Sequence, residues 1–178
     1  ANWGSGTKVG NAIVATANKL SANGFSIPDF IAPSTTDVCN DPSYFDTMMG
    51  ISGVSTYLKE ISYHRYSGTL SCMQAVGTRA LNNGMRASML EFWSSSNGYQ
   101  ALHEDLTLGR NSAWQQGIFA DAFNAETAWV HISGGNGVVS PMARFTRQYT
   151  KYVRPGARRI QASSSNSTFD PLTFINSN

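Results

Sequence analysis

Four short apolar runs recur along the chain and are separated by stretches with helical periodicity. They cover residues 30–32, 60–66, 87–92 and 127–132, so their starts lie 27 to 40 residues apart. A strand with its following helix takes roughly 30 residues or more. Short, continuously apolar strands are typical of a parallel sheet whose faces are covered by helices. The spacing therefore predicts an α/β fold of four consecutive βα units.

The intervening stretches place apolar residues at helical spacing and end at helix-stop residues. In residues 7–23, for example, Val9, Ile13 and Leu20 share a face, and Asn23 and Gly24 follow. Further helices are expected over residues 41–58 with a break at 50–53, 70–83, 102–108, 112–123 and 141–152. Two short strands, in residues 157–163 and 169–175, are expected to form a β tail.

A carboxylate, Glu91, closes the third apolar run and is followed by Phe92, Trp93 and a loop rich in Ser, Asn and Gly. In barrels of βα units the loops after the strands build the active face. We therefore expect Glu91 to be catalytic and Trp93 to offer an aromatic surface to a substrate. A surface Glu that merely ends a strand, and a Trp in the core, are the alternatives.

Polar and aromatic side chains also end the second apolar run. Side chains alternate along a strand, so His64 and Tyr66 share one face, while Tyr63 and Arg65 take the other. His64 and Tyr66 are predicted to contact the carboxylate or a substrate hydroxyl. A structural histidine satisfied within the fold is the competing interpretation.

The fourth run places Trp129 and His131 on one face, with His131 nearer its end. We predict that both bind substrate, although core packing is the default role for a strand Trp. Ser34, Thr35 and Asp37, after the first run, can bind hydroxyl groups or simply form a turn.

Four segments in this order resemble the C-terminal half of the (β/α)8 barrel of clan A retaining glycoside hydrolases, nearest to family 30. They are EISYHRYSG at residues 60–68, ASMLEFWSSSNGY at 87–99, NSAWQQGIFADAFNAETAWVHIS at 111–133 and FTRQYTKYVRPGARRIQASSS at 145–165. They correspond to the sixth barrel strand, the seventh strand, the seventh helix with the eighth strand, and the exit into an accessory β domain. The resemblance implies half a TIM barrel at residues 1–152 and a β tail at 153–178.

The resemblance also implies hydrolysis of β-glycosidic bonds in a polysaccharide or glycoconjugate, with Glu91 as the nucleophile. The acid/base Glu of these enzymes lies in an Asn-Glu pair that this chain lacks. Because a full barrel needs about 250 residues, we expect a fragment, or a partner that completes it: a second copy or an N-terminal half. A catalytically inactive glycan-binding or structural fragment is the alternative, as is a different α/β enzyme using His64 and Glu91.

The remaining carboxylates are poor acid/base candidates by position. Glu60 and Glu126 stand before their strands, at the end of a barrel opposite the active face. Glu104 and Asp105 fall in a predicted helix, where solvated charge is the usual role.

Composition narrows the classes of partner. Charged residues make up 13% of the 178 residues, against about 25% in ordinary soluble domains, and an uncharged polar surface is common in secreted carbohydrate-active enzymes. We expect no nucleic-acid partner, no membrane span, no metal site and no cofactor. Cys39 and Cys72 follow the first two strands on the same side of the predicted sheet, which favours a disulfide, with two free thiols as the alternative.

Overall fold

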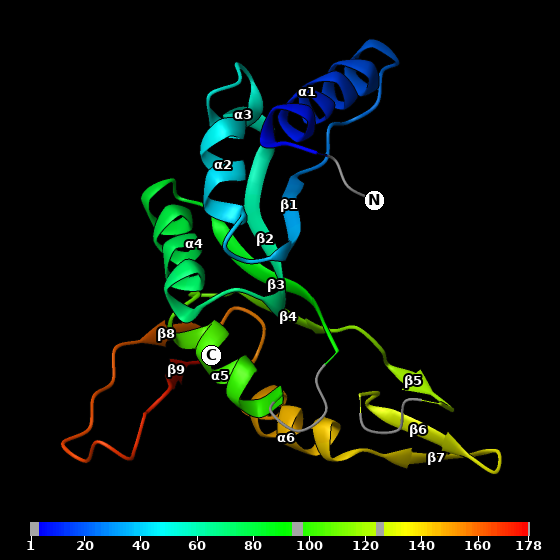
Figure 1. Cartoon of the computed structure of the whole chain (residues 1–178), viewed down its shortest axis with the longest axis vertical. Coiled ribbons are helices and arrows are strands. Elements are labelled where there is room, and N and C mark those ends of the chain that lie inside the picture. Colours follow the sequence, from blue (N-terminus) through cyan, green and yellow to red (C-terminus); the bar gives the residue numbers. More distant parts are fainter. Residues whose placement is uncertain (1–3, 94–97, 124–126, 178) are drawn as a thin grey trace. The chain divides into compact units, whose positions relative to one another are not determined.

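The computed structural model describes residues 4–93, 98–123 and 127–177. The chain divides into two compact units (Figure 1). The first contains Ala1–Phe92 and Glu104–Gly117, and the second contains Trp93–His103 and Ile118–Asn178. No described helix is long and apolar enough to cross a membrane.

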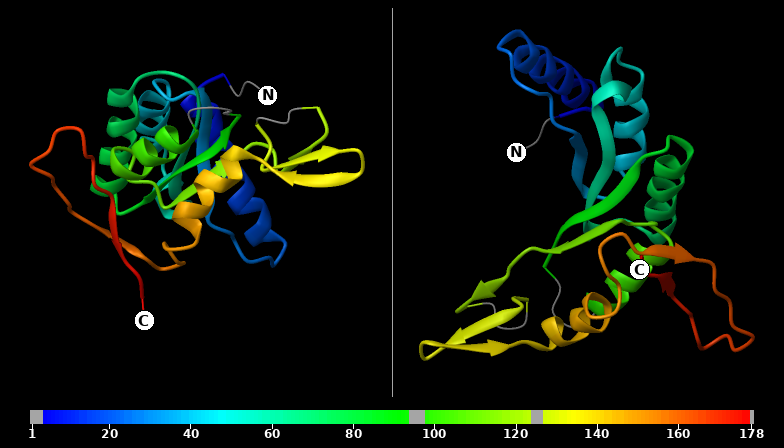
Figure 2. Two further views of the ribbon diagram at one scale, coloured as in Figure 1. Left: turned by 90° about the horizontal axis from the view of Figure 1, so that it is seen from below. Right: turned by 180° about the vertical axis from the view of Figure 1, so that it is seen from behind.

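The first unit is built on a four-stranded parallel sheet. Its strands are β1 (Phe30–Asp37), β2 (Leu58–Ser67), β3 (Arg86–Phe92) and β4 (Ala113–Gln116), which lie side by side in chain order (Figure 2). All four strands end at the same edge of the sheet, so the loops that follow them share one side. The described strands form an open sheet, consistent with part of a TIM barrel.

Four helices of this unit pack against the sheet: α1 (Gly6–Ala22), α2 (Asp41–Met49), α3 (Val54–Tyr57) and α4 (Leu70–Asn82). Ser5 caps α1 by accepting a hydrogen bond from the backbone N–H of Lys8, and Thr69 caps α4 in the same way. The apolar core lies between helices and strands, where Met48 and Val76 meet Ile61 and Met89. These strand residues alternate with Ser62 and Ser88, so the other face of the sheet is polar.

Helix α5 (Gly98–Thr107) contributes residues to both units. The second unit also holds the short strands β5 (Ala120–Asp121), β6 (Val130–Ser133) and β7 (Asn136–Val139), helix α6 (Pro141–Thr150), and the β8–β9 pair at Arg158–Ile160 and Thr173–Ile175. β5 and β6 pair in parallel, while β6–β7 and β8–β9 are antiparallel. Ser140 caps α6 by accepting from the backbone N–H of Ala143.

The fourth strand of the sheet is not the one that the apolar runs predict. Residues 112–123, expected to be a helix, contain β4 and β5 instead, and the predicted strand at 127–132 contributes β6 to a separate sheet. Two hydrogen bonds favour the strand over the helix: Ser112 N–H donates to the carbonyl of Ala87 in β3, and the Trp114 indole N–H donates to Asp105. The first three predicted strands and the helices between them are confirmed.

Candidate active site at the end of the parallel strands

Glu91 lies near the C-terminal end of β3, opposite His64 of β2 in the strand register. The Tyr66 hydroxyl donates a 2.6 Å hydrogen bond to Glu91 Oε1. Burial and this carboxylate together raise the pKa of the Tyr66 phenol, so it remains a donor at any physiological pH. The structure thus brings together three residues singled out from sequence: Glu91, His64 and Tyr66.

The Tyr66 ring lies between two other rings at this end of the sheet. His64 packs edge-on against it with ring centres 5.9 Å apart, and Phe92 lies at 6.3 Å on a tilted plane. Such contacts are typical of aromatic pairs. They restrict the rotation of Tyr66 and therefore hold its hydroxyl on Glu91.

The loop after β1 borders the same end of the sheet and is covalently tied to the start of α4. Cys39 and Cys72, for which the sequence left a disulfide and two free thiols open, form a disulfide. The Ser34 and Ser62 hydroxyls share a 2.7 Å hydrogen bond between β1 and β2. Asp37 accepts a hydrogen bond from the backbone N–H of Cys39, so it supports the loop rather than projecting from it.

A buried carboxylate that the sequence did not mark as special, Asp41, stands at the start of α2. It has no exposed surface, and its Oδ1 lacks a hydrogen-bond partner among the described residues. Thr35 Oγ1 lies 2.7 Å from Asp41 Oδ2 and 2.6 Å from the Asp37 carbonyl oxygen. Burial chiefly raises the Asp41 pKa to about 8, with the Asp37 charge adding to it and the hydrogen bonds from Thr35 opposing it.

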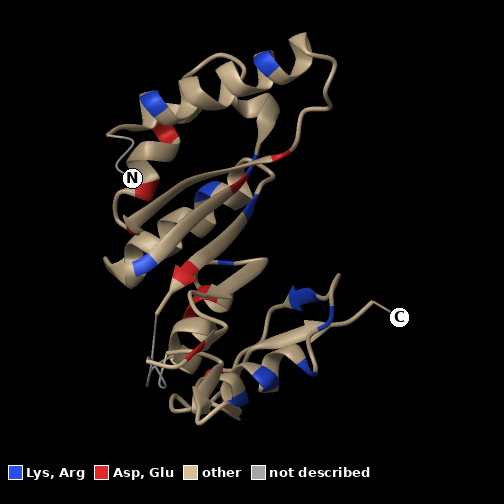
Figure 3. Cartoon of the chain, turned by 90° about the vertical axis from the view of Figure 1, so that its right-hand side faces the viewer, with Lys and Arg blue, Asp and Glu red and all other residues tan. Residues whose placement is uncertain are grey.

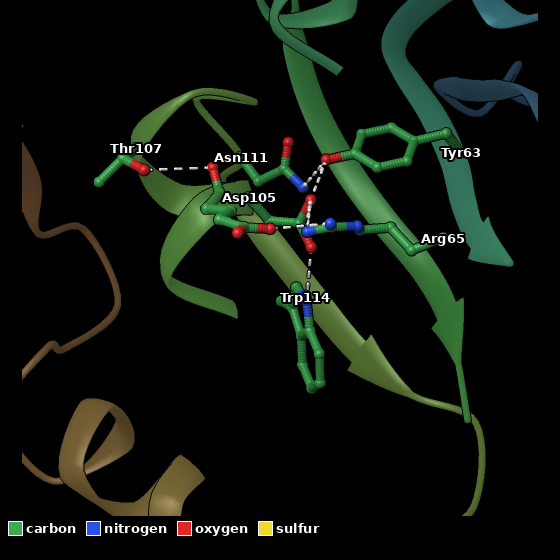
Figure 4. A network of polar contacts seen from close by, with 7 residues as sticks. Tyr63, Arg65, Asp105, Thr107, Asn111 and Trp114 are labelled. Carbon is green, nitrogen blue, oxygen red and sulfur yellow. Dashed lines mark hydrogen bonds and ion pairs between the residues drawn. The ribbon is translucent and has the colours of Figure 1, made fainter. Parts of the chain in front are cut away.

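Asp105 belongs to a polar network on the face of β2 opposite His64 and Tyr66. This residue was expected to be solvated, but it is completely buried and accepts hydrogen bonds from the Tyr63 hydroxyl at 2.5 Å and the Trp114 indole at 2.9 Å (Figure 4). Burial raises its pKa to about 6, against the lowering effect of the Arg65 charge and of both donors. Helical periodicity alone could not reveal this role, because its hydrogen-bond partners come from β2 and β4 and not from the helix.

Arg65 and Glu104 extend that network towards the surface. Arg65 donates to Glu104 Oε2 at 2.8 Å and its other nitrogen lies 3.6 Å from Asp105 Oδ1. Arg65 thus points away from His64 and Tyr66, as strand alternation predicts. The network anchors β2 to α5 directly beside the two residues that face Glu91.

The other predicted substrate-binding residues belong to the second unit. Trp93 is 50% exposed. Trp129 packs against Phe119 with ring centres 6.0 Å apart, and its buried indole N–H has no hydrogen-bond partner within the described ranges. His131 Nδ1 lies 3.2 Å from the Asp121 carbonyl oxygen. That these residues share one site with Glu91 stays a prediction.

Of the remaining carboxylates, Glu60 is buried at the start of β2 and pairs with Arg86 at 3.2 Å. This places it at the end of the sheet opposite Glu91. Glu126 lies outside the described residues.

No protein-family model matches the sequence. Three solved structures are similar to it. The catalytic domain of GH30 xylanase C from Talaromyces cellulolyticus matches 97% of this chain at a TM-score of 0.78 and 19% identity. The endo-beta-1,6-glucanase BT3312 matches 92% (TM-score 0.68, 15% identity), and a GH30 endoxylanase from Clostridium papyrosolvens C71 matches 96% (TM-score 0.61, 13% identity).

The chain spans only about half the length of these proteins, 42% of xylanase C and of BT3312 and 53% of the Clostridium endoxylanase. At such low identity the likeness concerns the fold. By fold, the chain is similar over nearly all its length to part of a GH30-type glycoside hydrolase, as its sequence resemblance predicts.

Proposed function

We propose that the chain carries the nucleophile side of a retaining glycoside hydrolase site, with Glu91 as the nucleophile. The observation that supports this most directly is the 2.6 Å hydrogen bond from Tyr66 to Glu91 at the C-terminal end of a parallel strand. A carboxylate that attacks carbon must keep one oxygen free and be held in a fixed orientation. Tyr66 occupies Oε1, and within the described residues Oε2 is left for the attack.

The proposed reaction proceeds in two displacements. Glu91 Oε2 forms a bond to the anomeric carbon while the glycosidic C–O bond breaks, and the departing oxygen takes a proton from a carboxylic acid. Water then releases the sugar from the glycosyl-enzyme ester. The Tyr66 hydroxyl donates to the carboxylate in the free enzyme and to the ester oxygen in the intermediate.

The acid is proposed to come from outside this chain. The two carboxyl groups of a retaining site stand about 5 to 5.5 Å apart, and the solved relatives by fold are about twice as long. We propose that a segment completing the barrel, either an N-terminal half or a second copy, supplies it. Residues 1–152 then form the barrel part and residues 153–178 the β tail.

Sugar binding is proposed for His64, Trp93, Trp129 and His131. The indole N–H of Trp129, which has no acceptor among the described residues, supports this role, because a buried donor without an acceptor costs about 1 to 3 kcal/mol. A substrate hydroxyl would remove that cost. Aromatic rings also present an apolar face to the C–H side of a pyranose.

The substrate is proposed to be a β-linked polysaccharide, since two of the similar structures are xylanases and the third is an endo-beta-1,6-glucanase. Secretion is proposed with it. The disulfide between Cys39 and Cys72 supports an oxidising compartment.

Aryl β-xylosides and β-glucosides with a 2,4-dinitrophenyl leaving group test the role of Glu91. This leaving group departs without protonation, so the assay does not need the acid. We expect Glu91→Ala to abolish dinitrophenol release, and azide to restore it with formation of the α-glycosyl azide. Asp29→Ala, which removes an exposed carboxylate, is the matched control and should keep the rate of the parent chain. A β-glycosyl azide would instead assign Glu91 as the acid/base, and unchanged release in Glu91→Ala would exclude it as the nucleophile.

A further inference from the structure

We propose that the second unit carries a binding site for acidic glycans, in a pocket between α6 and β9. The inference goes beyond the proposed function, because it concerns residues of the second unit that have no part in the displacement at Glu91. It predicts that the chain binds polysaccharides bearing uronic acid carboxylates through this pocket.

The pocket has a volume of about 300 Å³, at the lower end of the range for small-molecule sites. Tyr149 and Tyr152 line it from the end of α6, and Thr173 and Phe174 line it from β9. Gln148 adds an amide. Three aromatic rings with hydroxyl and amide groups between them match a sugar, which presents C–H faces edged by hydroxyl groups.

The walls of the pocket are held together by the backbone around it. The Asn176 side chain donates to the Tyr152 carbonyl at 2.8 Å and accepts from the Arg154 N–H at 3.0 Å. The Ser177 hydroxyl donates to the Gly156 carbonyl at 3.1 Å. These contacts join the end of α6 to the segment after β9, so the pocket exists before a ligand binds.

The segment that contains the pocket carries an excess of positive charge, which favours an anionic ligand. From residue 141 to the C-terminus the sequence has six Lys and Arg residues and one acid, Asp170 (Figure 3). That acid lies 3.0 Å from His103 Nε2. The basic residues are Arg144, Arg147, Lys151, Arg154, Arg158 and Arg159.

Among these basic residues, Lys151 lies beside an aromatic residue that lines the pocket, Tyr152. Its ammonium group stands 5.3 Å from the centre of the Tyr152 ring, and Tyr152 is 60% exposed. A sugar stacked on Tyr152 would therefore place a ring carboxylate within reach of a cation. Opposite charges a few ångströms apart attract even close to water, with an energy that salt reduces.

Affinity electrophoresis in gels that contain polygalacturonate tests the proposal, with fully methyl-esterified polygalacturonate as the neutral comparison. We expect the chain to be retarded by the acidic polymer and not by the ester. Tyr152→Ala should weaken binding about tenfold, the upper end of a single aromatic contact, and Lys151→Gln about threefold. The matched controls are Phe25→Ala and Lys19→Gln on the first unit, both of which should bind as the parent does.

Each other outcome overturns the proposal. Equal retardation by the ester shows that charge is not recognised, and unchanged retardation of Tyr152→Ala shows that the pocket is not used. A single-stranded oligonucleotide can be added as a competing polyanion. If it displaces the parent and Tyr152→Ala from polygalacturonate equally well, the binding is nonspecific charge attraction. Glu91→Gln should be retarded like the parent, whether or not Glu91 proves to be a nucleophile. Loss of retardation in that variant would show that the polymer binds at Glu91 and not in the pocket.

Discussion

Asp41→Asn is expected to stabilise the protein, with a gain that grows as the pH rises from 4 to 8. In the folded state burial raises the Asp41 pKa from 3.8 to about 8. Between these values the carboxyl is ionised in the unfolded chain and protonated in the folded one. Folding then binds a proton, so raising the pH lowers the free energy of unfolding.

The magnitude follows from the same two values. At about 1.4 kcal/mol per pKa unit, the interval from 3.8 to pH 7 gives an upper limit of about 4 kcal/mol for the cost of Asp41. The folded carboxyl is still mostly protonated at pH 7, so replacing it by Asn removes little negative charge from the first helical turn. We expect Asp41→Asn to raise the free energy of unfolding by about 1 to 3 kcal/mol at pH 7.

The geometry explains why Asn fits in this position. The single proton of the Thr35 hydroxyl cannot serve both oxygens beside it, those of Asp41 and Asp37. A protonated Asp41 donates to Thr35, which then donates to the Asp37 carbonyl. The amide of Asn donates in the same place, so the chain of hydrogen bonds is retained without an ionisable group.

Urea unfolding followed by tryptophan fluorescence at pH 4 to 8, with the disulfide intact, measures this difference. The parent chain and the variant should agree near pH 4 and diverge towards pH 8. Asp29→Asn, at an exposed position, is the control and should differ from the parent by a constant amount. Parallel curves for Asp41→Asn, or a variant that is less stable than the parent at pH 8, would refute the reasoning.

Three further substitutions or treatments have defined expectations. Tyr66→Phe should slow the release of dinitrophenol by at least tenfold with little change in the free energy of unfolding. The substitution removes the hydrogen bond to Glu91, and hydrogen bonds to charged groups are worth about 1.5 to 3 kcal/mol. An equal loss of rate and of stability would point to a structural role for Tyr66. Tyr63→Phe should lower the free energy of unfolding by about 1 to 3 kcal/mol and raise the Asp105 pKa further. The loss of stability with rising pH should then continue above pH 6 in the variant, where it levels off in the parent. Reducing the disulfide between Cys39 and Cys72 should lower the free energy of unfolding by about 3 to 4 kcal/mol for a loop of this length. Urea unfolding with and without reductant measures the difference, and an unchanged midpoint would exclude a stabilising role for the disulfide.

The sequence predicts the first part of the fold well because each element there has a local signal. The strands β1, β2 and β3 are short apolar runs, α2 begins with Asp41 and Pro42, and α4 is capped by Thr69. β4 has only four residues, and its neighbours in sequence contain spaced apolar residues that also suit a helix. What fixes it as a strand is pairing with β3, which no local pattern contains.

In the candidate site, too, the features with a local pattern were predictable and those that depend on distant pairing were not. Strand alternation predicts correctly that His64 and Tyr66 face one way and that Tyr63 and Arg65 face the other. The burial of Asp105 was missed, because its partners come from two strands and cannot be recognised within the helix. For Asp41 the sequence indicates only the start of the helix expected at residues 41–58, because Asp followed by Pro42 is typical of a first helical turn.

The nucleophilic role of Glu91 is the central claim, and a 2-deoxy-2-fluoro glycosyl donor with a 2,4-dinitrophenyl leaving group tests it most directly. The fluorine slows hydrolysis of the glycosyl-enzyme, and the leaving group removes the need for an acid, so the ester should accumulate. With xylosyl or glucosyl donors, peptide mass spectrometry should locate one sugar on Glu91, and Glu91→Gln should remain unmodified. A label on another carboxylate, or equal labelling of Glu91→Gln, would contradict the claim.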